Sequence, residues 1–166
     1  MAGDVTLLHR WHHDNYDVAK KHIHQQLGDI SDMRLTGRQV MVAVYVRPGG
    51  LSAGGLLQGT LKEQKNDWWE GKASLIIATG PSAFDGTDAY LKATFHQSIK
   101  PKVGDWVITN ANAGIQMNIS GEGSERVKSP DRRGDLMDTY EWDGWPCRVV
   151  LDDSIIMLVD APHTVI

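Results

Sequence analysis

The hydrophobic positions of the chain fall into short runs that are separated by turn-forming residues, which is typical of a mostly β protein. Most of these runs are rich in β-branched residues and are too short for stable helices. We expect five strands, at Gln39–Val46, Ser74–Ala78, Asp105–Thr109, Arg148–Leu151 and Ile155–Val159. The last two flank Asp152 and Asp153, so these two carboxylates are expected to form a turn rather than a pair of catalytic acids.

A helical pattern occurs near the N-terminus. Between Asp14 and Leu27 the apolar residues recur at three- and four-residue steps, Asp14 can cap the helix, and Gly28 can end it. We therefore expect an N-terminal helical extension over residues 1–32. It precedes a β domain over residues 33–162.

Two segments of this β domain differ from the strands in composition. Five glycines fall within Gly49–Gly59, so residues 49–60 are expected to form a mobile loop unless a partner binds them. Residues 114–142 are polar and contain several glycines, a pattern that predicts an insertion with weak structure. A shorter excursion is expected as a hairpin near Phe84–Asp88.

The composition and the net charge argue against several classes of function. The 166 residues are 41% hydrophobic and 23% charged, as in an ordinary globular domain, and the net charge is −4. An acidic chain has no basic field for nucleic acid or membrane surfaces, so neither is an expected partner. Cys147 is the only cysteine, which excludes an intrachain disulfide and a cysteine-based zinc site. With no apolar leader or membrane span in the sequence, we expect a soluble cytoplasmic protein without a cofactor.

Four segments resemble, in order along the chain, the co-chaperonin GroES. They are the strand ending at Val46, the loop Ser52–Leu57, the segment Lys102–Ile108 and the ending Ile155–Ala161. The chain is therefore similar to the GroES-like co-chaperonin family over Met33–Ala161. Its N-terminal extension and its polar insertion are additions that typical members lack, and enlarged relatives of this kind are known in phages.

The resemblance implies an irregular β-barrel that assembles into a ring and docks on a GroEL-like chaperonin through its loop. The family's ring closes by pairing one subunit's first strand with its neighbour's last strand, which places the implied subunit interface at Val40, Met41, Val42, Ile155, Ile156, Met157 and Leu158. The family's roof hairpin corresponds to Phe84–Asp88. The implied partner-binding residues are Gly54, Gly55, Leu56, Leu57 and Gln58.

The chemistry of this loop fits a docking role regardless of the family. Leu56 and Leu57 form an apolar tip on a glycine-rich tether, and each leucine contributes roughly 1.5–3 kcal/mol if a partner buries it fully. The family has a third apolar residue where this chain has Gln58, which predicts weaker docking. Several weak contacts in one ring reinforce each other because later contacts become intramolecular.

Four tryptophans lie in or beside the segments that depart from the family, at Trp68, Trp69, Trp142 and Trp145. They either cap the ends of the barrel or anchor further interfaces, as large aromatics often do. The second interpretation leads to an alternative function, a head or tail component of a virion whose partners are other virion proteins. The two functions differ in what the Leu56-Leu57 tip contacts.

Enzymatic and metal-binding patterns are weaker. Gly50–Gly54 matches a hydrolase nucleophile elbow around Ser52, with His96 or His163 as the base, but no helix is expected directly after it. The N-terminal histidines include His22 and His24, which lie on different faces of the expected helix and lack a completing carboxylate or cysteine. We expect neither a catalytic site nor a metal site.

Overall fold

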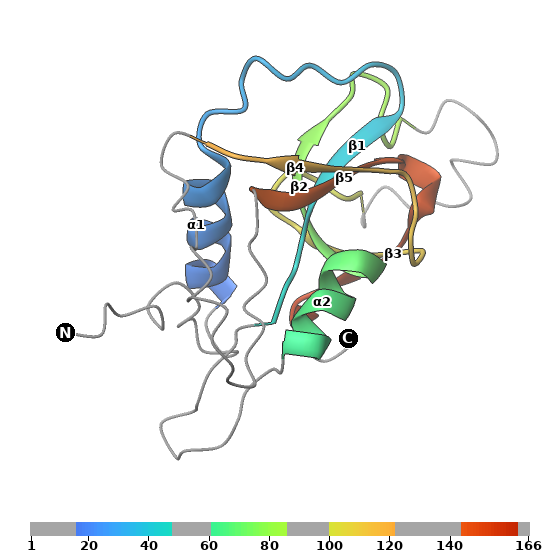
Figure 1. The fold of residues 1–166 in the computed structure, drawn as a ribbon. Coiled ribbons are helices and arrows are strands. Elements are labelled where there is room, and N and C mark those ends of the chain that lie inside the picture. The colour runs from blue at the N-terminus through green and yellow to red at the C-terminus, as the bar shows by residue number, and fades with distance from the viewer. Residues whose placement is uncertain (1–15, 48–60, 86–99, 122–143, 163–166) are drawn as a thin grey trace, which may run out of the picture.

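The described residues form a six-stranded antiparallel sheet with two α-helices (Figure 1). The computed structural model describes residues 16–47, 61–85, 100–121 and 144–162. Along the chain its elements are α1 (Tyr16–Leu27), β1 (Gln39–Val44), α2 (Leu61–Glu70), β2 (Ala73–Thr79), β3 (Trp106–Thr109), β4 (Ile115–Ile119), β5 (Trp145–Leu151), the short 3₁₀ helix η3 (Asp152–Ser154) and β6 (Ile155–Val159).

The strand order in the sheet is β4-β5-β1-β2-β3-β6. The prediction of a mostly β protein is confirmed, and all five expected strands are present. β4 and β6 lie at opposite ends of the order and do not pair with each other, so the described residues form an open sheet rather than the expected closed barrel.

Both faces of the sheet are covered. Met41 and Ala43 of β1 point into one hydrophobic cluster, which α1 joins through Ile23. Val40 and Val42 point into a second cluster on the opposite face. Because successive strand residues face opposite sides, a strand covered on both sides needs apolar residues at every position. This explains the uninterrupted apolar run of β1.

The predicted N-terminal helix is present as α1. Its buried face consists of Ala19, Ile23 and Leu27. Gly28 ends it with a φ of 67°, and its N–H donates to the carbonyl of His24 at 3.1 Å. This is the left-handed conformation that glycine adopts most readily after a helix. α1, the described helix of the extension, therefore contributes to the same core as the sheet.

Two elements were not predicted. α2 follows the glycine-rich segment directly, and its sequence contains few apolar residues. β4 lies inside the range that was expected to be a weakly structured insertion, so that prediction is wrong for Ile115–Ile119. Within the described part of the chain, β4 is an edge strand that pairs with β5 alone, and most of its side chains are exposed or half-buried. A short, half-polar edge strand gives a weak sequence signal.

The turn before β3 explains part of the family-like sequence. Gly104 has a φ of 95°, and the N–H of Asp105 donates to the carbonyl of Lys102 at 3.1 Å. The side chain of Asp105 closes the same turn by accepting from the N–H of Lys102 at 3.0 Å. The sequence Lys-Val-Gly-Asp thus encodes a specific turn, in which glycine supplies the positive φ and aspartate satisfies the backbone.

A fully buried carboxylate, Asp152, joins three distant segments. Its Oδ1 accepts from the Nη2 of Arg38 at 2.6 Å, and its Oδ2 accepts from the N–H of Phe84 at 3.0 Å. Phe84 is buried with a φ of 58°. The expected turn at Asp152 and Asp153 is confirmed as η3 between β5 and β6. Of the expected hairpin near Phe84–Asp88, residues 86–88 lie outside the described residues.

We expect Asp152→Ala to lower the free energy of unfolding by about 2–4 kcal/mol, because it removes the buried acceptor of Phe84 and the main partner of Arg38. The matched variant Asp153→Ala removes a more exposed carboxylate that lies 3.6 Å from Arg38, and we expect a change below about 0.5 kcal/mol. Urea unfolding followed by circular dichroism measures both. Equal losses in the two variants would contradict a special role for Asp152.

Candidate functional site

The predicted docking loop leaves the sheet at the end of β1 and returns through α2. The partner-binding residues expected from sequence, Gly54, Gly55, Leu56, Leu57 and Gln58, lie outside the described residues, as does Ser52. The structure does describe the two ends of the segment, Arg47 after β1 and Leu61 at the start of α2. These ends form the base of the loop.

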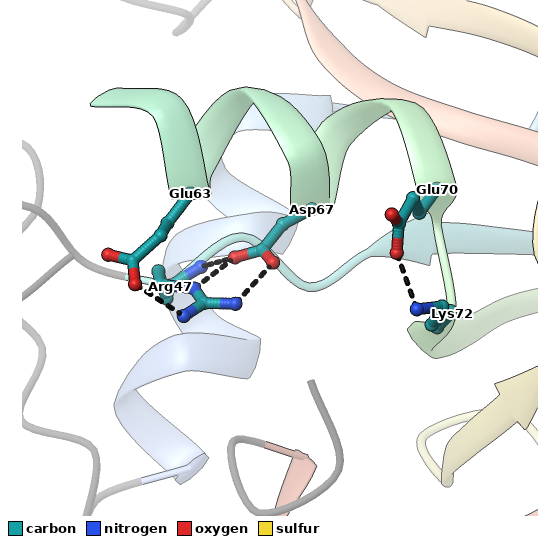
Figure 2. Close-up of polar contacts among 5 residues, drawn as sticks. All are labelled: Arg47, Glu63, Asp67, Glu70 and Lys72. Atoms are coloured by element: carbon teal, nitrogen blue, oxygen red, sulfur yellow. Dashed lines mark hydrogen bonds and ion pairs between the residues drawn. The ribbon is translucent and has the colours of Figure 1, made fainter. Parts of the chain in front are cut away.

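A bidentate ion pair, the Arg47–Asp67 clamp, joins the two ends (Figure 2). The guanidinium of Arg47 donates from Nε to the Oδ2 of Asp67 at 2.8 Å and from Nη2 to Oδ1 at 2.8 Å. The backbone N–H of Arg47 donates to the same Oδ2 at 3.0 Å. Glu63 lies 3.5 Å from the Nη1 of Arg47. Bidentate pairing fixes orientation as well as distance.

The helical spacing of α2 explains why two acids reach one arginine. Glu63 and Asp67 are four residues apart and therefore share one side of the helix. Asp67 is buried, and its hydrogen bond raises the pKa of the Arg47 guanidinium above its ordinary value. Arg47 therefore remains charged throughout the accessible pH range, and the clamp does not depend on titration of the arginine.

Further contacts hold α2 on the sheet. Gly71 ends the helix with a φ of 57°, and its N–H donates to the carbonyl of Asp67 at 2.9 Å. The buried Arg148 of β5 donates to the carbonyl of Trp69, and burial lowers the pKa of this guanidinium. A Cβ at position 71 would lie 2.4 Å from the Nε of Arg148. Glycine is therefore required at position 71 for both its conformation and its size.

The clamp has the chemistry of an anchor rather than of a catalyst. A cavity of about 120 Å³ lies beside it, lined by Tyr45, Arg47, Asp67 and neighbouring polar groups. The charged groups in this lining are engaged with one another: Arg47 pairs with Asp67, and Glu70 with Lys72 at 2.6 Å. Both oxygens of Asp67 already accept hydrogen bonds from Arg47, which leaves few acceptor positions for a substrate.

The structure separates the two strands that were expected to form the subunit interface. Val40, Met41 and Val42 lie in β1, which pairs with β2 on one side and β5 on the other and is buried. β1 thus has no free edge for a neighbouring subunit, and these three residues belong to the core. The sequence could not show this because β1 acquires its second neighbour, β5, from about 110 residues away.

β6 has the opposite character. It lies at the end of the sheet and pairs with β3 alone among the described residues. Ile156 and Met157 are 59% and 51% exposed, whereas Ile155 is buried and Leu158 is half-buried. Of the two expected interface strands, β6 therefore offers both an unpaired edge and exposed apolar side chains.

The tryptophans that were considered as interface anchors differ in their exposure. Trp145 is buried, and its Nε1 donates to the carbonyl of Val44 at 3.0 Å, so it belongs to this chain's core. Trp68 is buried too and contacts Trp69 edge-to-face at 4.6 Å. Trp69 is 48% exposed, and of the four described tryptophans it alone is exposed to a partner. Trp142 lies outside the described residues.

Other candidate groups do not gather into a site. Cys147 is buried, and burial raises the pKa of its thiol to about 12, so the reactive thiolate is scarce at neutral pH. His22 contacts Trp145 edge-to-face at 5.6 Å, while His24 is exposed. Among the described residues no three histidine, cysteine or acidic side chains lie close enough together to hold a metal. His96 and His163 lie outside those residues.

Comparison with known proteins does not assign the chain to a family. No protein-family model matches it, and no curated protein matches it. Neither helix of the described part of the chain is long and apolar enough to cross a membrane.

We expect Asp67→Ala to lower the free energy of unfolding by about 1.5–3 kcal/mol, because it removes both side-chain bonds of the clamp and the acceptor of the Arg47 amide. Hydrogen exchange of the Arg47 amide should also become faster. The control Glu70→Ala breaks the more exposed pair with Lys72 on the same helix, and we expect about 0.5 kcal/mol or less. Unchanged exchange at Arg47 in Asp67→Ala would contradict the clamp.

Proposed function

We propose that this chain is a co-chaperonin-like protein that caps a chaperonin ring and assists the folding of a client, with a phage capsid protein as the candidate client. It acts by binding, without catalysis, in the cytoplasm of the cell that contains the chaperonin. The GroES-like resemblance at four ordered segments suggests this function. The observation that carries it is the way in which the loop is anchored.

The anchoring suits a loop that must transmit a docking force to a rigid body. One end continues from the central strand β1, and the other enters α2, which the Arg47–Asp67 clamp ties back to the end of β1. A partner that holds Leu56 and Leu57 would thus pull on the most buried strand of the sheet. Binding groups on a loop that a rigid scaffold positions are a common arrangement in proteins.

Two of the four family-like segments are also neighbours in the sheet. Lys102–Ile108 leads into β3, and Ile155–Ala161 contains β6, which pairs with β3 through Trp106 and Val159. This pairing supports the resemblance because segments that are distant in sequence form one local structure. It leaves the outer edge of β6 for a neighbouring subunit in the proposed ring.

A ring is necessary for the proposed activity because one leucine pair gives only weak docking. Linked copies raise the effective concentration of each later contact into the millimolar range, so that overall binding exceeds single-site binding by orders of magnitude. Gln58 reduces the apolar tip to two leucines. The chain therefore depends more on multivalency than a relative with three apolar residues.

The alternative function is a virion structural component that uses the same domain as a building block. Trp69 and Ile115 favour it, because they are exposed at 48% and 70%, Trp69 near the C-terminal end of α2 and Ile115 on the edge strand β4. Permanent interfaces commonly bury such side chains. In that case the Leu56-Leu57 tip would contact another structural chain and would not need a nucleotide.

The decisive experiment is co-sedimentation with a purified host chaperonin, with and without ATP. We expect the intact protein to sediment with the chaperonin only when nucleotide is present. The double variant Leu56→Asp, Leu57→Asp should lose binding at least tenfold, because each aspartate removes an apolar anchor. Absence of binding by the intact protein would overturn the co-chaperonin proposal in favour of the virion component.

The matched control places the same two charges at exposed apolar positions outside the loop. Val103→Asp, Ile115→Asp replaces side chains that are 50% and 70% exposed, and we expect it to bind the chaperonin as the intact protein does. Equal loss in both double variants would show that added charge, rather than the leucine tip, determines binding.

The proposed ring predicts that the β6 edge controls assembly. We expect Ile156→Lys, Met157→Lys to reduce the oligomer to monomer in analytical ultracentrifugation while circular dichroism stays unchanged, because both side chains are more than half exposed. Lys102→Ser, Lys100→Ser provides a control that alters exposed charge near β3. An oligomer that persists in the β6 variant would place the subunit interface elsewhere.

A further inference from the structure

The C-terminal end of α2 is bonded to a distant part of the chain. Four successive carbonyls, which we name the α2 terminus, each accept a hydrogen bond from outside the helix: those of Trp69, Glu70, Gly71 and Lys72. The last carbonyls of a helix have no partners within it and need acceptor contacts elsewhere. Here the donors include groups of β3, of β5 and of residues 110–114, which we name the β3–β4 turn.

Three of these bonds come from the end of β3 and from the β3–β4 turn. The N–H of Asn112 donates to the carbonyl of Glu70 at 2.9 Å, and the N–H of Thr109 donates to the carbonyl of Lys72 at 2.8 Å. The hydroxyl of the buried Thr109 donates to the carbonyl of Gly71 at 3.0 Å. Asn112 has a φ of 59°, which is uncommon outside glycine. The helix end thus holds the turn from which β4 begins.

Arg148 joins the α2 terminus to the same turn. Its Nη2 donates to the carbonyl of Trp69, and its Nη1 donates to the carbonyl of Ala113 at 3.2 Å. The residue is 3% exposed, and no carboxylate of a described residue lies within 4.0 Å of its guanidinium. A buried charge is costly unless hydrogen bonds satisfy it, so Arg148 needs both carbonyls together. If the helix end moved away, the guanidinium would turn to solvent and the bond to Ala113 would be lost as well.

α2 is too short to be stable by itself. It has ten residues, and isolated helices shorter than about 12–15 residues are marginal in water. Apart from the packing of Trp68, two sets of polar contacts support it: the Arg47–Asp67 clamp along its side (Figure 2) and the bonds at the α2 terminus. Loss of either set removes much of this support, and the other set then loses the helical geometry on which it depends.

From these contacts we infer that α2 is a coupling element, which is helical only while both sets of contacts are intact. The clamp at the loop base and the β3–β4 turn then open together, as one cooperative unit below global unfolding. Coupling of this kind is reciprocal, so a contact that holds the loop base protects the β3–β4 turn, and a contact on the β4 edge protects the loop base. The inference is independent of the proposed co-chaperonin function, because it rests on bonds within the chain.

Native-state hydrogen exchange of the full chain, followed by NMR, tests the coupling first from the clamp. Asp67→Ala breaks the clamp. We expect the amide of Asn112 to exchange at least tenfold faster, although its own acceptor, the carbonyl of Glu70, is unchanged by the substitution.

The same measurement tests the coupling from the turn. Arg148→Met and Thr109→Val each remove side-chain donors to the α2 terminus. The amide of Arg47 keeps its acceptor Asp67 in both variants, and we expect it to exchange about three- to tenfold faster. Thr109→Val conserves the shape of the side chain, so it tests the inference even if Arg148→Met does not fold.

Asp152→Ala is the matched control, because it weakens the fold at contacts that α2 does not make. We expect it to lower global stability and to leave the exchange of the Arg47 and Asn112 amides unchanged. Equal acceleration in this control would show that both amides exchange only through global unfolding. An unchanged Asn112 rate in Asp67→Ala, or an unchanged Arg47 rate in Thr109→Val, would show that the two regions open separately. Each of these results would overturn the inference.

Discussion

The structure depends on the burial of β1 on both faces and along both edges. Strands β2 and β5 satisfy its backbone groups, and two hydrophobic clusters cover its side chains. An unpaired backbone group in such a position would cost several kcal/mol, so both neighbours must be present before β1 is stable. The proposed function relies on the loop base and on the β6 edge. The loop base directly follows β1, and β6 is connected to β1 through β2 and β3.

The sequence predicted β1 and β2 well because their apolar runs reflect burial on both faces of the sheet. The sequence also indicated where the chain turns at Gly28 and Gly104, because the positive φ found at both positions favours glycine. α2 and β4 were missed for a common reason. α2 is stabilised by the Arg47–Asp67 clamp, and β4 is stabilised by its pairing with β5. The composition of a short segment does not reveal such distant partners.

For the candidate site, the sequence predicts a docking loop that lies outside the described residues, and it gives no indication of the Arg47–Asp67 clamp at the base of that loop. Arg47 and Asp67 are 20 residues apart, and charged residues at that separation have no periodic signature. A cavity of about 400 Å³ lined by Tyr16, Trp106 and Asp160 was not predicted either, because it combines residues that are far apart in the sequence. The interface predicted at β6 stays a prediction, and the structure adds that Ile156 and Met157 are exposed there. Val40, Met41 and Val42 lie instead in a strand paired on both edges, which could not be foreseen because the order of strands in a sheet cannot be deduced from one strand.

The position of β1 in the sheet has a consequence for how the chain folds during synthesis. Met41 pairs with Val149, and Arg38 bonds to Asp152, which lies 114 residues later. β1 therefore cannot complete its contacts until β5 and Asp152 have left the ribosome. Until then, the edge of β1 that pairs with β5 is unprotected. Contacts of such long range slow folding and favour aggregation of the incomplete chain. A protein proposed to assist the folding of others thus has a nascent chain that is itself vulnerable until its last strands emerge.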